Sequence, residues 1–208
     1  MSSILFWLGA LAVVSLLSLL LKILIAATAG RQIGASALAE QPDAIHLQKA
    51  DATAWKNPGA PNQLAQSFAT QGFHDAGVHT IAEMPIVVQL MANPESSFYV
   101  AIYQHPQAGT WFDLASRFED GTSLTYSTAR PNALKPRPGH PVANMHGADP
   151  AQVLEKATAQ RPRKPLIPAA AYAAVSMFES AYAESMAYRK QVGISTGEVV
   201  GTAMRKVA

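Results

Sequence analysis

The stretch "WFDLASRFEDGTSLTYS", residues 111–127, indicates two short strands joined by a tight turn. Apolar and polar residues alternate on both sides of Asp120-Gly121, and an Asp-Gly pair between two such runs is a strong hairpin signal. Because successive side chains in a strand point to opposite faces of a sheet, the alternation predicts one apolar face and one more polar face. The expected core face consists of Phe112, Leu114, Phe118, Leu124 and Tyr126.

The segments before this hairpin also have strand character. Residues 97–104 ("SFYVAIYQ") and 77–94 ("GVHTIAEMPIVVQLMANP") are rich in aromatic and β-branched residues. Pro85 should divide the second segment or place it at a sheet edge, because proline cannot donate a backbone hydrogen bond. The sequence therefore predicts an antiparallel meander of four or five strands.

Helical patterns flank the expected sheet. One runs from Pro61 to Gly72, and a second begins at Asp149, a favourable N-cap residue followed by proline. A terminal helix should begin at Ser195, because Glu198 completes a capping box. The longest pattern carries an apolar stripe that we expect to cover the core face of the hairpin. This stripe consists of Tyr172, Val175, Phe178, Tyr182 and Met186.

Helices laid on an antiparallel sheet define an α+β fold. We expect a transmembrane anchor over residues 1–29, a juxtamembrane linker over 30–60, and one α+β globular domain over 61–208. In this arrangement the sheet packs on the C-terminal helices.

The anchor prediction rests on an apolar segment, Ile4–Ala27, whose only charge is Lys22. Its 24 residues would span about 36 Å as a helix, enough for a hydrocarbon core of about 30 Å. A cleaved signal peptide is the alternative, but this run is longer than a signal peptide's core and no positive charge precedes it. Lys22 and Arg31 favour a cytoplasmic domain on a single-pass protein of the bacterial inner membrane. A periplasmic location of the domain is the alternative.

Composition excludes several classes of site. The chain has no cysteine, which excludes disulfides and thiolate metal sites. The net charge is only +2, and the densest basic cluster, Arg161–Lys164, is interrupted by proline. We interpret this cluster as a solvated linker, with contact to lipid headgroups as the alternative. No nucleic-acid partner is expected.

Catalytic and metal-binding motifs are weak in this sequence. His74 and His79 are five residues apart, which places them on opposite faces of a regular strand unless Gly77 introduces a turn. His140 and His146 lie in the proline-rich segment 130–150 and would need tertiary folding to join a site. Phosphate-binding glycine loops and nucleophile-elbow motifs are absent from the sequence. We therefore expect no catalytic residues, cofactor or metal, and favour a protein that is not an enzyme.

The second face of the strands is the main candidate for binding. Tyr, Trp and Arg are enriched at the centres of protein interfaces. We therefore expect a non-catalytic interaction or accessory domain, anchored in the bilayer through Ile4–Ala27, with a protein partner or a second copy as ligand. A small-ligand or lipid-binding domain is the first alternative and a histidine-dependent hydrolase or metal enzyme the second. The proposed interaction face consists of Tyr99, Tyr103, Trp111, Asp113 and Arg117.

Overall fold

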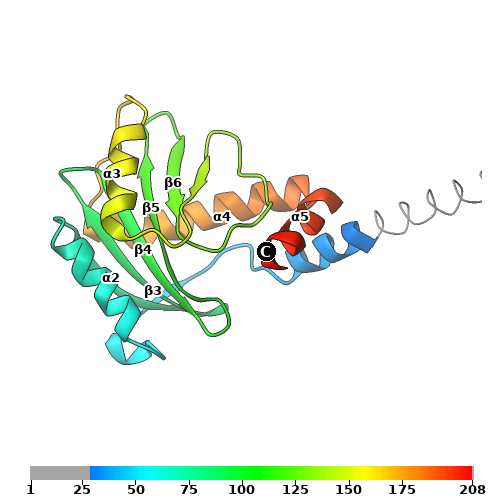
Figure 1. Ribbon diagram of the computed structural model, residues 1–208, viewed down its shortest axis with the longest axis horizontal. Coiled ribbons are helices and arrows are strands. Elements are labelled where there is room, and N and C mark those ends of the chain that lie inside the picture. The colour runs from blue at the N-terminus through cyan, green and yellow to red at the C-terminus, as the bar shows by residue number, and fades with distance from the viewer. Residues whose placement is uncertain (1–28, 208) are drawn as a thin grey trace, which may run out of the picture. The chain divides into compact units, whose positions relative to one another are not determined.

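The computed structural model describes residues 29–207, and its centre is a seven-stranded sheet in the order β1 to β7 (Figure 1). Strands β1 to β6 pair antiparallel with their neighbours, whereas β7 runs parallel to β6. The α+β class and the β5–β6 hairpin are confirmed. The strands are β1 (Leu47–Ala50), β2 (His74–Ile81), β3 (Met84–Asn93), β4 (Phe98–His105), β5 (Gly109–Arg117), β6 (Ser123–Ser127) and β7 (Val142–Asn144).

The predicted strand number and the purely antiparallel pairing are wrong. The additional strands are β1, which lies within the expected linker, and β7, which lies in the proline-rich segment. β1 has four residues and β7 has three, which is too short for a clear alternation pattern. Each also pairs with a segment far away in sequence, which a local pattern cannot indicate. Pro85 does not divide a strand; it lies in β3 beside a shift of register between Thr80 and Ile81.

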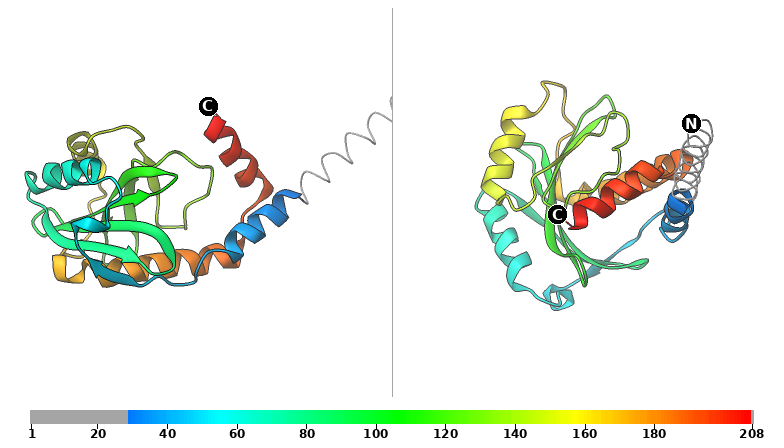
Figure 2. Two further views of the ribbon diagram at one scale, coloured as in Figure 1. Left: turned by 90° about the horizontal axis from the view of Figure 1, so that it is seen from below. Right: turned by 45° about the vertical axis from the view of Figure 1, so that its right-hand side comes forward.

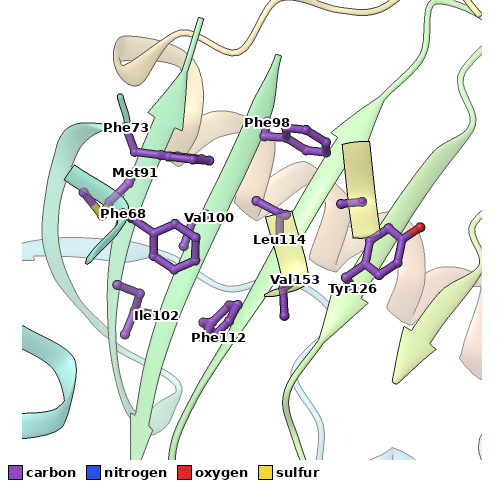
Figure 3. Packing of buried hydrophobic residues seen from close by; sticks show 11 residues of the cluster. Phe68, Phe73, Met91, Phe98, Val100, Ile102, Phe112, Leu114, Tyr126 and Val153 are labelled. Carbon is purple, nitrogen blue, oxygen red and sulfur yellow. The ribbon is translucent and has the colours of Figure 1, made fainter. Parts of the chain in front are cut away.

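One face of the sheet packs against α2 (Gly59–Ala69) and α3 (Pro150–Gln160), and we call it the α2/α3 face. Figure 3 shows its core, in which rings from α2 and β5 meet edge to face with centroids of Phe68 and Phe112 5.0 Å apart. Asp149 caps α3 by accepting a hydrogen bond from the Gln152 backbone at 2.9 Å, as predicted. The most fully buried residues of this core include Phe68, Phe98, Ile102, Phe112, Leu114 and Val153.

The opposite face packs against α4 (Ala174–Val192), and we call it the α4 face (Figure 2). Its buried residues include Val88 and Leu90 of β3, and Val175, Phe178 and Tyr182 of α4 pack against them. The expected stripe therefore covers the face opposite to the one predicted. The cause is that the central strands are apolar on both faces, so alternation alone cannot say which helix covers which face.

Contacts within the chain divide it into two compact units. The sheet unit comprises residues 42–131 and 135–191. Among the described residues, the terminal unit comprises 29–41, 132–134 and 192–207.

The terminal unit is held by close approaches at glycines. Residues 29–39 are helical, and α5 (Thr196–Val207) begins with the predicted Ser195–Glu198 capping box. A Cβ at Gly30 would lie 2.5 Å from Thr196 Cγ2, and a Cβ at Gly34 would lie 2.8 Å from the Ile194 carbonyl oxygen. Only glycine permits this separation between the segments.

The predicted anchor, Ile4–Ala27, lies outside residues 29–207 and stays a prediction. Within residues 29–207, no helix is long and apolar enough to cross a bilayer.

Candidate functional site

An open pocket of about 650 Å³ lies in the sheet unit, beside edge strand β1 and the beginning of β2. Short segments far apart in sequence form its walls: the end of β1, the turn η1 (Ala52–Ala54), the β2 strand and the turn η2 (Ala171–Ala173). We call it the Trp55 pocket. The side chains that matter for its chemistry are Lys49, Asp51, Trp55, Asp75, Gln89 and Tyr172.

A β-bulge forms one wall of the Trp55 pocket. Asp75 is opposite Met91 and Gly77 is opposite Leu90, so Ala76 is an extra residue in β2. Gly77 has a φ of 103°, which side chains rarely tolerate. Asp75 holds the bulge, because its Oδ1 accepts hydrogen bonds from the Gly77 backbone at 3.0 Å and from Gln89 Nε2 at 2.9 Å. Bulges of this kind often redirect side chains beside functional sites.

Trp55 is 4% exposed, and the residues that follow it are held by Gln104 on β4. Gln104 Oε1 accepts from the Lys56 backbone at 2.8 Å, and its Nε2 donates to the Asn57 carbonyl at 2.8 Å. The Trp55 Nε1 group is buried and has no acceptor among residues 29–207. An unpaired buried donor costs about 1–3 kcal/mol, so an external acceptor at this nitrogen would stabilise the site.

Tyr172 lies at the same pocket and is 93% exposed. A fully exposed tyrosine beside a buried tryptophan is typical of a recognition surface, since both rings bury large areas at little entropic cost. The lining residues Asp51 and Asp75 supply negative charge, and Lys49 supplies one positive charge. Charges of both signs suit the orientation of a polar ligand, and the described lining includes no pair of nucleophile and base.

The predicted interaction face is the α4 face, and α4 contacts most of its proposed members. The Tyr99 hydroxyl donates to the Pro168 carbonyl at 3.2 Å, and the Tyr103 ring lies 6.0 Å from the Phe178 ring. Trp111 stacks on Tyr103 at 4.9 Å. Arg117 lies 3.7 Å from the Glu184 carboxylate. The five residues do share one face, as alternation predicted, but a helix of the same chain covers it.

Asp113 is the most perturbed acid of that face. Its Oδ1 is buried without a hydrogen-bond partner among the described residues. Burial raises the pKa of Asp113 to about 6, and the Ser127 and Tyr103 side chains oppose the rise by favouring the charged form. The group is therefore partly protonated near neutral pH.

The four candidate histidines do not form one site. The bulge places His74 and His79 on the same face, opposite Ala92 and Val88, but four residues of β3 separate them by about 13 Å. His146 Nδ1 lies 3.1 Å from the Thr128 carbonyl oxygen instead. Across residues 29–207, no three His, Cys, Asp or Glu side chains gather in a group that suits a metal ion.

His140 has a contact that resembles catalytic geometry, since its Nδ1 lies 2.8 Å from Ser123 Oγ. The same nitrogen lies 3.3 Å from Arg137 Nη2, and Arg137 also donates to Glu184 at 2.8 Å. Burial and the Arg137 charge lower the pKa of His140. A guanidinium at the basic nitrogen disfavours proton abstraction from Ser123, so this group connects the 130–150 segment to β6 and α4.

Sequence reasoning missed the Trp55 pocket. Trp55 lies in a stretch assigned to the linker, and Tyr172 was assigned to the buried stripe. An isolated tryptophan in a polar, proline-rich segment was the available signal, because such a residue is usually buried by tertiary contacts. For the bulge that positions Asp75, Gly77 is the sequence feature that could have indicated it.

Comparison of the chain with known protein families, with curated proteins and with solved structures finds no match.

Proposed function

We propose that this chain is a membrane-anchored, non-catalytic binding protein that holds a partner protein at the Trp55 pocket. Ile4–Ala27 is the proposed anchor in the bacterial inner membrane, with the sheet unit on the cytoplasmic side. One observation carries the proposal: a buried tryptophan whose Nε1 has no acceptor among residues 29–207 lines the same open pocket as an almost fully exposed tyrosine. Binding of a segment there would remove the Tyr172 ring from water.

The chemistry of the pocket indicates what kind of segment fits. A basic side chain of an extended segment would complement Asp51 and Asp75. A backbone carbonyl of that segment would reach Trp55 Nε1 only if the atoms that bury this nitrogen moved aside. Strand β1 is at the edge of the sheet and its last residues line the pocket, so such a segment would lie alongside it. Gln48 and Lys49 are exposed there, which disfavours indiscriminate pairing of this edge.

The contacts of the α4 face favour a structural role for the five residues predicted to bind. Tyr99, Tyr103 and Arg117 each have a neighbour on α4 or just before it. A partner would have to displace α4 to reach them. We therefore place the interaction surface at the Trp55 pocket.

Tyr172→Ala tests this proposal. Tyrosine at an interface centre contributes about 2 kcal/mol or more, so the variant should bind its partner at least about tenfold more weakly. The measurement is site-specific photo-crosslinking at position 172 in native membranes, followed by affinity measurement with the captured partner. Because Tyr172 is exposed, thermal stability should not change.

Val142→Ala is the matched control, since Val142 is 53% exposed on β7, outside the pocket lining. It should leave the affinity unchanged. Equal binding by the Tyr172 and Val142 variants would contradict the proposal.

A small molecule is the second candidate for the same pocket. Its volume of about 650 Å³ falls within the range of ordinary ligand sites, about 300–1,000 Å³. A ligand site between the sheet and α4 is less favoured, because Arg137 of the 130–150 segment bonds to Glu184 of α4 and His140 bonds to Ser123 of β6. Native mass spectrometry of the full chain distinguishes the candidates: a retained small molecule that is lost in Tyr172→Ala would favour the ligand.

A further inference from the structure

Helix α5 of the terminal unit is amphipathic, and its polar side, not its apolar side, faces the rest of the unit. At 100° per residue, Val199, Val200, Ala203 and Met204 lie along one side of the helix. Its other side carries Glu198, Gly201, Thr202 and Arg205. In a globular protein, the apolar side of such a helix normally packs against the core.

In this unit the polar side of α5 makes the internal contacts. Thr202 Oγ1 accepts a hydrogen bond from the Ala133 backbone at 3.0 Å, and Arg205 donates to the Asn132 carbonyl. A Cβ at Gly201 would lie 2.8 Å from the Ala133 Cβ, so the helix approaches this segment closely. Glu198 is only 7% exposed. The polar side of α5 is therefore occupied.

The apolar side of α5 is exposed to solvent. Val200 is 48% exposed and Met204 is 69% exposed. They are one helical turn apart and so form a continuous surface. Five of the seven large apolar side chains exposed in residues 29–207 belong to this small unit, which argues against random scatter. The other three are Ile33, Leu134 and Val192.

The position of the unit along the chain indicates what covers this surface. The first residue that the structure describes, Ala29, is helical and lies two residues after the end of the apolar segment Ile4–Ala27. Two residues span at most about 7 Å, so a bilayer that contains this segment lies next to the unit. Arg31 is basic and exposed, and suits the headgroup level. The net charge of the terminal unit is small, so apolar contact has to contribute most of its binding to the bilayer.

We infer that the terminal unit lies on the bilayer surface, with Val200 and Met204 of α5 inserted at the interface. An interfacial helix buries its apolar face about 5–10 Å into the boundary between headgroups and acyl chains. The inference rests on the proposed anchor, because without it nothing brings the unit to a membrane. The occupant is lipid and not a second protein surface.

Single-cysteine labelling of the full chain tests this inference, since the natural chain contains no cysteine. Val200→Cys and Met204→Cys each receive an environment-sensitive fluorophore in the chain reconstituted into phosphatidylcholine–phosphatidylglycerol bilayers. Val142→Cys is the matched control, an exposed valine of the sheet unit. We measure quenching by brominated lipids and by aqueous iodide. Alkaline extraction of the same membranes reports on the anchor separately.

Labels at 200 and 204 should be quenched by brominated lipid and shielded from iodide, while the label at 142 should behave in the opposite way. Val200→Asp should reverse both effects for the label at 204, without releasing the chain from the membrane. The docking would be refuted if iodide reached the labels at 200 and 204 as readily as the label at 142. If the chain also resisted alkaline extraction, the anchor would be unaffected by this result. Labels that are shielded from iodide but not quenched by brominated lipid would also refute the docking, because a protein surface would then cover α5. Release of the chain by alkali would refute the anchor itself.

Discussion

Asp113 lies on β5 between Ala101 and Ser127 of the neighbouring strands, on the face that α4 covers. The Oδ1 atom of this carboxylate is buried and has no hydrogen-bond partner among the described residues. Burial therefore raises the pKa of Asp113 from 3.8 to about 6. The folded chain binds this proton more tightly than the unfolded chain does.

This difference makes stability depend on pH. Between about pH 4 and 6 the folded state holds more protons than the unfolded state, so the free energy of unfolding should fall as pH rises through that window. The contribution is on the order of 2–3 kcal/mol, from about 1.4 kcal/mol per pKa unit. Asp113→Asn should abolish this slope and stabilise the chain at pH 8. Urea unfolding in mild detergent at pH 5 and pH 8 measures both.

Asp120→Asn is the control, because Asp120 is an exposed acid whose pKa is lowered by its contacts with Lys164 and Thr122. This variant should keep the slope between pH 4 and 6. An unchanged slope in Asp113→Asn would mean that another group titrates in this range.

At the scale of elements, the bulge in β2 determines how the Trp55 pocket is built. It adds one residue to β2, so that both His74 and His79 lie on the α4 face while Asp75 reaches Gln89. Gly77 permits the bulge through its φ of 103°. A Cβ at this position would also lie 3.3 Å from His79 Cε1, a contact that the buried ring can relieve only by moving.

Gly77→Ala should therefore destabilise the chain by about 1–3 kcal/mol, the usual cost of a residue held in a disfavoured backbone conformation. Gly59→Ala is the matched control, because Gly59 is the first residue of α2 and a Cβ there meets nothing within 4 Å. The control should be neutral or slightly stabilising, since alanine favours helix. Thermal unfolding of the full chain compares them. An equal change in thermal stability for the two variants would show that a side chain at position 77 does not strain the bulge.

At the scale of the whole molecule, the sheet unit has a protected centre and short edges. Strands β3, β4 and β5 are paired on both sides and covered on both faces. At the edges, β1 has four residues and β7 has three. Local opening should therefore begin at the edges and reach the centre only with global unfolding.

Hydrogen exchange of the full chain in bilayers tests this order. Amides of β4 should exchange at least about 100-fold more slowly than those of β7, because edge strands open without breaking the core. Amides within α3, which buries Val153, should be intermediate or slow. Equal protection of β7 and β4 would show that the proline-rich segment belongs to the same cooperative unit as the core.

Local sequence patterns predicted the parts of this fold that depend on neighbouring residues. Asp120-Gly121 and the alternation around it predicted the β5–β6 hairpin, and Asp149 and Ser195 predicted the starts of α3 and α5. Alternation also grouped Tyr99, Trp111 and Arg117 on one face. These features follow from backbone geometry and from hydrogen bonds within a few residues, which is why the sequence is sufficient for them.

The remaining features depend on contacts between distant segments. Which helix covers which face, the pairing of β1 and β7, and the pocket shared by Trp55, Asp75 and Tyr172 all join residues far apart in the chain. The free energy of such contacts comes from burial and packing, which leave little periodic trace in a short strand or a turn. For this reason the apolar strands could be recognised from their residues, whereas the Trp55 pocket followed only from the folded arrangement of β1, β2 and the turns η1 and η2.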